Sequence, residues 1–336
     1  TGFVEGGALP TASILGTGAA RDLPIATSLA LDQEHDLPHG LIERLTGVAQ
    51  RPRAGARDQV ALATEAANAA LADAGCEARA LDAILHAAAV PYQTIPATAP
   101  LVQQALGLPD GAVAAFDIGA TCLGFLAALQ HAAAMVETGR WTQVLVVASE
   151  RISENLDWQV PSTAGLFGDG AGAAVVGREP GALRIGQIVL QTHPSGYEAA
   201  RLRAGGTRLG ARAMAEEARF VMDGPALFGL TRRRFEAFVL GNLRAAGLGL
   251  DDIDLIVPHQ ASPVALRLMA RALGVGEDRL VDLSATHGNQ VAASLPVTLD
   301  HARREGRIAP GSRVLMLGTA AGVTFGTALL EAASCD

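Results

Sequence analysis

The chain has 336 residues, of which 49% are hydrophobic and 18% are charged, and its formal net charge is −8. This length is sufficient for a large buried core, and the composition excludes an intrinsically disordered chain. The negative charge argues against a general nucleic-acid-binding protein. Every basic residue is an arginine, because the sequence contains no lysine, and this excludes a Schiff base on a lysine amine.

No apolar run approaches the roughly 18 residues of a membrane span, and the N-terminal residues lack the pattern of a signal peptide. We therefore expect no membrane partner and a cytoplasmic location. The three cysteines, Cys76, Cys122 and Cys335, have neither the number nor the spacing of a disulfide framework or a zinc site. Cys76 and Cys335 are expected to be incidental thiols.

Apolar strands and helices alternate along the chain. A strand is predicted at residues 12–18, and a lid-like insertion follows around residues 23–47. Continuous apolar runs, typical of strands with both sheet faces covered, predict further strands at residues 83–88, 144–148, 253–257 and 314–317. The segments between them predict helices at residues 58–74, 122–138, 228–246, 263–273 and 290–305. Residues 181–223, rich in glycine and arginine, are expected to include a long surface loop.

The order of these elements repeats within the chain. LADAGCEARALDAILHAAAVP at residues 71–91 and LRAAGLGLDDIDLIVPHQASP at residues 243–263 both read as helix end, glycine, acidic turn and buried strand. The repeat continues in the same order with FDIGAT and VDLSAT, and with VLVVAS and VLMLGT. The sequence therefore predicts an α/β fold of two duplicated halves, residues 1–178 and 179–336, with helices on and between two sheets.

Cys122 lies in DIGATCLGFLAAL, between the end of a predicted strand and the start of an apolar helix. A helix N-terminus favours a thiolate through its dipole and its free N–H groups. This position therefore predicts a lowered thiol pKa and a nucleophile. A small buried core cysteine is the alternative, and the residues alone leave both open.

His259 lies in DLIVPHQAS, directly after a buried strand, where the catalytic groups of α/β folds gather. The corresponding residue of the first half is Ala87, so the repeat does not need a histidine there for packing. A polar strand cap is the alternative.

Asn289 lies in SATHGNQVAAS, in the turn that the repeat pairs with the Cys122 turn. In this alignment His287 takes the place of Cys122, and Asn289 matches Gly124. Two such turns, related by a pseudo-twofold axis, would bring Cys122 and Asn289 towards one central site. An ordinary turn beside a glycine is the alternative.

Two glycine-rich loops also stand near strand ends. LFGDGAGAAVV at residues 166–176 lacks the Gly-Lys-Ser/Thr of a nucleotide-binding loop, so it predicts a tight turn into a buried strand. The backbone N–H groups of GTAAGVTFG, at residues 318–326, are candidates for an oxyanion site, with a plain turn as the alternative. The arginine run at residues 232–234 is expected to be a solvated helix face.

Together these motifs resemble the ketoacyl synthase III family of condensing enzymes, in the thiolase superfamily. DIGATCLGF, FGDGAGA, VPHQAS and HGNQVAAS form an ordered set, and TGV at residues 46–48 and MDG at residues 222–224 also fit. The resemblance covers nearly the whole chain. It implies a thiolase fold in a layered α-β-α-β-α arrangement, and a homodimer. It also implies decarboxylative Claisen condensation of phosphopantetheine thioesters, carried by CoA or an acyl carrier protein, with no metal and no further cofactor.

The resemblance implies a role for each site residue. Cys122 would accept the acyl group. His259 and Asn289 would bind the carbonyl of a malonyl- or ketoacyl-type thioester and stabilise the enolate that forms as CO2 leaves. The N–H groups of Cys122 and of Ala320 or Ala321 would form a second oxyanion site.

Three positions depart from the family members that are primed with acetyl-CoA, in which a tryptophan and two arginines bind the CoA nucleotide. Leu41, Leu45 and Pro161 occupy these positions here, with Arg44 one position away. This favours a specialised relative in fatty acid or polyketide metabolism, one that uses an acyl carrier protein as donor or takes a bulkier primer.

Four further residues are candidates for substrate binding. Arg267 and Arg271, four residues apart on one face of a predicted helix, would form a basic rim for an acidic carrier, with a solvated face as the alternative. Phe220 and Phe228 are the other two.

Other functions stay open at this point. An ester- or amide-forming acyltransferase would use the same acyl-Cys122, and a catalytically silent partner subunit would keep the fold alone. A thiolase would carry a second cysteine near the last glycine-rich loop, and residues 311–326 contain none.

Overall fold

The computed structural model describes residues 11–178 and 180–334, so Cys335 lies outside the described residues. The first half contains β1 (Ser13–Ala19), β2 (Ile25–Thr27), α1 (Ser28–Glu34), α2 (Leu41–Thr46), β3 (Gln50–Pro52), α3 (Gln59–Asp73), β4 (Ala83–Ala87), α4 (Ala99–Ala105), β5 (Ala114–Asp117), α5 (Gly124–Glu137), β6 (Gln143–Glu150), α6 (Pro161–Ala164) and β7 (Gly170–Gly177). The second half contains β8 (Leu183–Thr192), β9 (Ala200–Arg201), β10 (Val221–Met222), α7 (Gly224–Ala245), β11 (Leu255–Pro258), α8 (Pro263–Leu273), α9 (Ser284–His287), α10 (Ser294–Arg304), β12 (Arg313–Ala320) and β13 (Thr324–Ala332).

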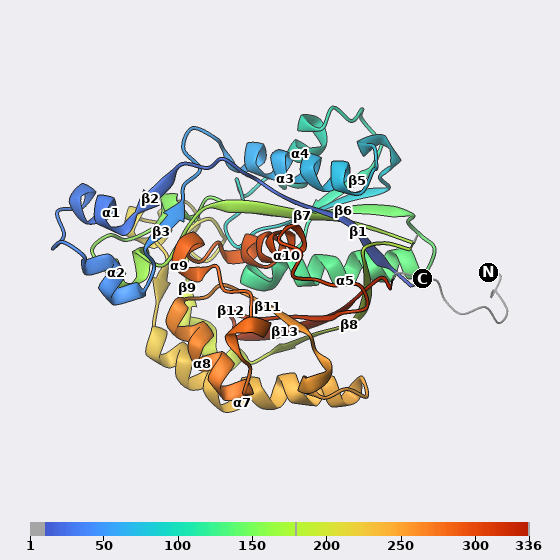
Figure 1. The fold of residues 1–336 in the computed structure, drawn as a ribbon. Coiled ribbons are helices and arrows are strands. Elements are labelled where there is room, and N and C mark those ends of the chain that lie inside the picture. Colours follow the sequence, from blue (N-terminus) through green and yellow to red (C-terminus); the bar gives the residue numbers. More distant parts are fainter. Residues whose placement is uncertain (1–10, 179, 335–336) are drawn as a thin grey trace.

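The helices and strands stack in five layers. In Figure 1, α3 and α4 cover the outside of a layer that holds β1, β7 and β6, and α7 and α8 cover the outside of a layer that holds β11, β12 and β13. Helices α5 and α10 lie between the two strand layers. This is the predicted α-β-α-β-α arrangement, and it confirms the α/β class and the thiolase fold.

The two predicted sheets are continuous with each other. The strand order is β11-β12-β13-β8-β1-β7-β6-β4-β5, with β1 and β8 at the centre. These two strands pair at only two positions, Ser13 with Arg184 and Ile14 with Leu183. A short junction of this kind lets the sheet divide into two layers on either side of it.

The strand pairing confirms the internal duplication. Ala83 of β4 pairs in parallel with Val144 of β6, and Leu255 of β11 pairs in the same way with Val314 of β12. Strands β1 and β8 take neighbouring places at the centre of the strand order. Within residues 181–223, β8 lies in the sheet between β13 and β1. Residues 202–220 contain only turns and short 3-10 segments, and none of them is buried, so this part is the expected surface loop.

Three predicted helices begin elsewhere in the structure. Helix α7 begins at Gly224, not at residue 228, because the Asp223 side chain accepts a hydrogen bond from the Ala226 N–H (2.9 Å) and caps it. Helices α5 and α10 start later than expected, because a 3-10 turn precedes each one, at Thr121–Leu123 and at Val291–Ala293. The predicted helices over residues 58–74 and 263–273 are confirmed as α3 and α8.

Small residues let α3 lie directly on β1. A Cβ atom at Gly16 would lie 2.3 Å from the Ala74 nitrogen, and one at Gly18 would lie 2.3 Å from the Ala70 nitrogen.

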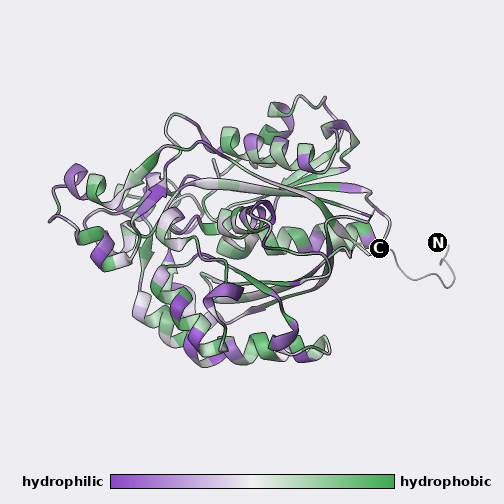
Figure 2. Ribbon diagram, viewed as in Figure 1, coloured by the Kyte–Doolittle hydropathy of each residue, from purple (hydrophilic) through white to green (hydrophobic). Residues whose placement is uncertain are grey.

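Figure 2 shows hydrophilic and hydrophobic residues together on the outer helices α7 and α8. Within the described ranges, no helix is both long enough and apolar enough to cross a membrane.

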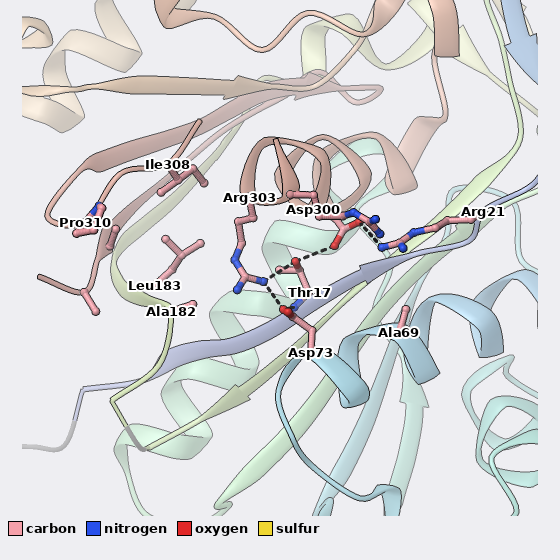
Figure 3. Close-up of a pocket in the computed structure, with 13 residues that line it drawn as sticks. Thr17, Arg21, Ala69, Asp73, Ala182, Leu183, Asp300, Arg303, Ile308 and Pro310 are labelled. Atoms are coloured by element: carbon pink, nitrogen blue, oxygen red, sulfur yellow. Dashed lines mark hydrogen bonds and ion pairs between the residues drawn. The ribbon is translucent and has the colours of Figure 1, made fainter. Parts of the chain in front are cut away.

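A polar cluster ties β1, α3 and α10 together, and Figure 3 shows its side chains pointing toward one another around a hollow of about 650 Å³. The Thr17 hydroxyl donates to Asp300 Oδ1 (2.9 Å) and accepts from Arg303 Nη1 (2.7 Å). Arg303 also pairs with Asp73 (2.5 Å). Burial raises the pKa of Asp300, so its carboxylate depends on this donor. One buried hydroxyl therefore links the two halves of the chain.

Replacing Thr17 by valine keeps the shape of the side chain but removes this hydroxyl. We expect the free energy of unfolding to fall by about 1–3 kcal/mol, because a buried carboxylate and a guanidinium each lose a partner. Urea unfolding measures the change. Thr138→Val is the control, since the exposed Thr138 hydroxyl binds only within its own helix end and should cost less than about 0.5 kcal/mol. Equal losses in the two variants would contradict a structural role for the cluster.

Candidate active site

A cavity of about 1000 Å³ brings the predicted site residues together. Its lining includes Cys122 from the first half, and His259 and Asn289 from the second. Ala320 and Ala321, the predicted oxyanion residues, line it as well. The structure therefore places all three candidate catalytic side chains on one space.

The other predicted substrate-binding residues divide into two groups. Phe220 and Phe228 line the cavity, and Phe220 packs edge-on against Phe167 with ring centroids 5.2 Å apart. Arg267 and Arg271 do not line it; they are exposed on α8.

Cys122 lies in the 3-10 turn that joins β5 to α5. The turn starts at Thr121, whose φ of 48° lies in the left-handed region that non-glycine residues rarely adopt. The Thr121 hydroxyl donates to the Ala321 carbonyl (3.3 Å), which fixes this turn on the end of β12. The N–H groups of Ala321 and of Cys122 itself lie close enough to the thiol to oppose a rise of its pKa. Two backbone N–H groups, one from each half of the chain, thus act on the sulfur.

The expected lowering of the Cys122 pKa is wrong. Burial and the nearby Glu150 carboxyl raise the pKa of the thiol to about 12, and the two N–H groups offset only part of this. The physical reason lies in the local structure: α5 begins at Gly124, so Cys122 precedes the helix and sits in an apolar wall. The resting residue is therefore a thiol and not a thiolate.

His259 follows β11 directly, and its N–H donates to the Leu317 carbonyl (2.8 Å), which continues the pairing with β12. The next residue of β12 is a glycine for a steric reason: a Cβ atom at Gly318 would lie 2.6 Å from the His259 Cβ. Burial lowers the pKa of His259 to about 4, so the imidazole is neutral at neutral pH. A neutral imidazole can donate one hydrogen bond and accept another.

Asn289 is held through its backbone and through one end of its amide. Its N–H donates to the Leu166 carbonyl (2.8 Å), and its carbonyl accepts from the Gly168 N–H (3.1 Å). Its side-chain Oδ1 accepts from the Val291 N–H (2.8 Å). The Nδ2 group, 3.4 Å from the Ala261 carbonyl, is the end that remains for the cavity.

The FGDG loop turns tightly into the buried strand β7, as predicted, but it also packs against the Asn289 turn. A Cβ atom at Gly168 would lie 2.4 Å from the His287 carbonyl oxygen, and one at Gly170 would lie 2.2 Å from Gln290 Nε2. These glycines let the loop contact the residues on either side of Asn289. The FGDG motif marks this loop in the sequence, but the motif does not show that the loop contacts the Asn289 turn.

The predicted equivalence of His287 with Cys122, and of Asn289 with Gly124, is wrong. The second 3-10 turn begins at Val291, whose φ of 51° repeats that of Thr121, and it leads into α10 as the first turn leads into α5. The counterpart of Cys122 is therefore Ala292. The short helix α9 (Ser284–His287) lengthens the second half at this point and shifts the alignment.

Two arginines on the cavity wall were not predicted as site residues. Arg201 and Arg232 both contribute to the lining, although Arg232 belongs to the run that was expected to be a solvated helix face. Arg232 is exposed, so it can be both solvated and part of the cavity wall. The sequence does not reveal this position, because it depends on how residues Pro194–Ala199 pack against α7.

Gly318→Ala tests the contact between β12 and His259. The added methyl group should push the imidazole out of its buried place, so the pKa of His259 should rise from about 4 towards 6.5. Overpacking should also lower the free energy of unfolding by about 1–3 kcal/mol. NMR titration of the imidazole, assigned with His259→Ala, measures the first effect. Gly241→Ala, where an added Cβ meets no atom within 4 Å, is the control. An unchanged titration would show that the glycine is not needed for the histidine's position.

Comparisons with known proteins identify the family of this chain. The family model of 3-oxoacyl-[acyl-carrier-protein] synthase III matches residues 116–194, and the model of its C-terminal part matches residues 243–332. The beta-ketoacyl-[acyl-carrier-protein] synthase III of Bordetella petrii is 40% identical over 308 residues, which cover 91% of each chain.

Solved structures give the same result. The 3-oxoacyl-[acyl-carrier-protein] synthase III of Aquifex aeolicus is 33% identical, with a TM-score of 0.85 over 95% of this chain and 99% of that chain. The priming β-ketosynthase of the R1128 polyketide pathway is 28% identical, with a TM-score of 0.89 over 98% of this chain and 99% of that chain. This chain belongs to the beta-ketoacyl-[acyl-carrier-protein] synthase III family.

Proposed function

We propose that this chain loads an acyl group on Cys122 and extends it by decarboxylative Claisen condensation with a malonyl- or ketoacyl-type thioester. One observation carries the proposal: Cys122, His259 and Asn289 line the same cavity, and the Ala321 N–H meets the thiol. Membership of the family supports it, since the relatives are named beta-ketoacyl-[acyl-carrier-protein] synthases.

In the first half-reaction, the Cys122 sulfur attacks the carbonyl carbon of the primer thioester. The thiol must lose its proton as the bond forms, because its pKa lies well above neutral. That proton passes to the departing phosphopantetheine sulfur, so the step needs no side-chain base. The N–H groups of Cys122 and Ala321 stabilise the tetrahedral oxyanion, at about 3 kcal/mol for each donor. The phosphopantetheine thiol then leaves with a proton.

In the second half-reaction, His259 and the Asn289 Nδ2 group donate hydrogen bonds to the thioester oxygen of the extender. The carbon–carbon bond to the carboxylate breaks, CO2 leaves, and the electron pair forms an enolate that these two donors stabilise. The enolate carbon attacks the acyl carbon on Cys122, and the carbon–sulfur bond breaks as the new ketone forms. The Cys122 sulfur then takes up a proton from the solvent and returns to its resting thiol. A neutral His259 suits this step, because it can donate from one ring nitrogen.

An acyl carrier protein is the proposed acyl donor. Leu41, Leu45 and Pro161, at the positions where other members bind the CoA nucleotide, cannot pair with phosphates. The rim of the cavity instead carries Arg232, and the exposed face of α8 next to it carries Arg267 and Arg271. A carrier with an acidic helix needs only such a basic rim around the cavity mouth.

The cavity size supports a specialised role in fatty acid or polyketide metabolism. At about 1000 Å³ it is at the upper end of ordinary ligand sites, so it has room for a bulky primer beside the phosphopantetheine arm. We also propose a homodimer, because β5 ends the strand order and so offers one edge for pairing with a second copy. The cytoplasm is the proposed location.

The two half-reactions should depend on different residues. Cys122→Ala should abolish the mass increase that a primer thioester produces, whereas His259→Ala and Asn289→Ala should still accept a primer but release CO2 at least a hundredfold more slowly, as expected for a lost oxyanion donor. Intact-protein mass spectrometry and CO2 release from a malonyl thioester measure the two steps. Acylation at Cys76 in the Cys122→Ala chain, or normal CO2 release in both other variants, would refute the assignment. Acylation without any CO2 release in the unmodified chain would instead indicate an ester- or amide-forming acyltransferase.

Acyl-carrier protein should acylate Cys122 at least tenfold more efficiently than the same acyl-CoA, a difference of about 1.4 kcal/mol. Rising salt should reduce the preference, because exposed charge pairs are screened. Replacing Arg267 and Arg271 by alanine should reduce it too, whereas Arg244→Ala, an exposed arginine at the end of α7, should not. The rate of Cys122 acylation by each donor, followed over time at low and high salt, measures the preference. An equal rate with acyl-CoA at low salt would exclude a carrier-specific donor site.

A further inference from the structure

Glu150, the last residue of β6, is a fully buried carboxyl group that the proposed chemistry does not use. Its Oε1 atom accepts hydrogen bonds from the Ala89 N–H (2.5 Å) and the Ala292 N–H (3.4 Å). Its Oε2 atom accepts from the Val90 N–H (3.4 Å). The carboxyl therefore joins the chain after β4 to the 3-10 turn that follows Asn289.

The internal repeat explains this position. Strand β6 ends against the Val291–Ala293 turn, just as β12 ends against the Thr121–Leu123 turn. At the Thr121–Leu123 turn, the Ala321 N–H lies close to the Cys122 thiol. At the equivalent Val291–Ala293 turn, the Glu150 carboxyl accepts a hydrogen bond from the N–H of Ala292, the counterpart of Cys122. Glu150 thus supports the half of the site that holds Asn289.

The turn that Glu150 contacts needs such support. Val291 is β-branched and has a φ of 51°, a conformation that persists only where neighbouring groups hold it. Two successive N–H groups of this turn are bound by side chains, that of Val291 by Asn289 Oδ1 and that of Ala292 by Glu150 Oε1. Because the first bond occupies Oδ1, the same turn determines that the Asn289 Nδ2 group is left for the cavity.

We infer that Glu150 is a positioning residue for Asn289, which holds the Val291–Ala292 turn so that the Asn289 amide presents Nδ2 to the substrate. The inference rests on the proposed function, since it is the enolate of the condensation that Nδ2 would stabilise. Its test therefore has to separate Asn289-dependent decarboxylation from acylation of Cys122.

The charge state of Glu150 supplies a readout that a purely structural residue would not give. Burial raises the pKa of Glu150 to about 8, and the Asp169 carboxyl adds to this, while the three N–H groups oppose it. The Cys122 thiol is a further titratable group close to it. Below pH 8 the carboxyl is neutral. Above pH 8 it becomes an anion beside the turn where the enolate charge forms, so decarboxylation should slow as pH rises.

The experiment follows CO2 release from a malonyl thioester between pH 6 and pH 9.5, corrected for uncatalysed loss. The unmodified chain should slow at least tenfold between pH 7 and pH 9.5. Glu150→Gln keeps the Oε1 acceptor but cannot ionise, so its rate should change less than twofold over this range. Asp117→Asn is the matched control, since Asp117 also accepts two backbone N–H bonds, from Thr98 and Ala99, away from the Asn289 turn. It should keep the alkaline loss.

A flat profile in the unmodified chain, or the same alkaline loss in Glu150→Gln, would overturn the inference. If Glu150→Gln does not fold, Glu150→Asp decides, because the shorter side chain no longer spans the distance to Ala292. It should slow CO2 release at least tenfold at pH 7 and leave acylation of Cys122 within twofold. Equal losses in both steps would overturn the positioning role. Absence of Cys122 acylation in the unmodified chain would refute the proposed function itself.

Discussion

The site depends on one contact between the halves of the chain, the one that joins the Cys122 turn to the end of β12. The Thr121 hydroxyl donates to the Ala321 carbonyl, and the Ala321 N–H lies close enough to the Cys122 thiol to lower its pKa. Side chains of the Cys122 turn thus act on both polar groups of Ala321. Because the cavity is lined by residues of both halves, it needs both strand layers in place.

Glycines determine how closely the parts of the site approach each other. Gly318 admits His259 to the face of β12, and Gly168 and Gly170 admit the FGDG loop to the Asn289 turn. A methyl group at Gly318 would collide with the His259 Cβ atom, one at Gly168 with the His287 carbonyl oxygen, and one at Gly170 with the end of the Gln290 side chain. These close contacts are possible because glycine has no side chain. The same principle lets α3 lie on β1 at Gly16 and Gly18.

Much of this could be predicted from the sequence, because the repeat constrains the strand order and the motifs mark the strand ends. The buried strands, the α3 and α8 helices and the gathering of Cys122, His259 and Asn289 follow from those two signals. The 3-10 turns did not, because a left-handed Thr121 or Val291 has no local signature. The pKa of Cys122 could not be predicted either, since it depends on burial and on Glu150, which is distant in sequence and near only in space.

The duplication produced two equivalent turns but only one of them carries sulfur, since Ala292 stands where Cys122 would repeat. The site therefore has one nucleophilic thiol, Cys122, for two thioester substrates. With the chemistry proposed here, the two thioesters have to be processed in succession, and the first carrier departs before the second acyl unit can react. The loss of symmetry at a single side chain would thereby give the enzyme ping-pong kinetics.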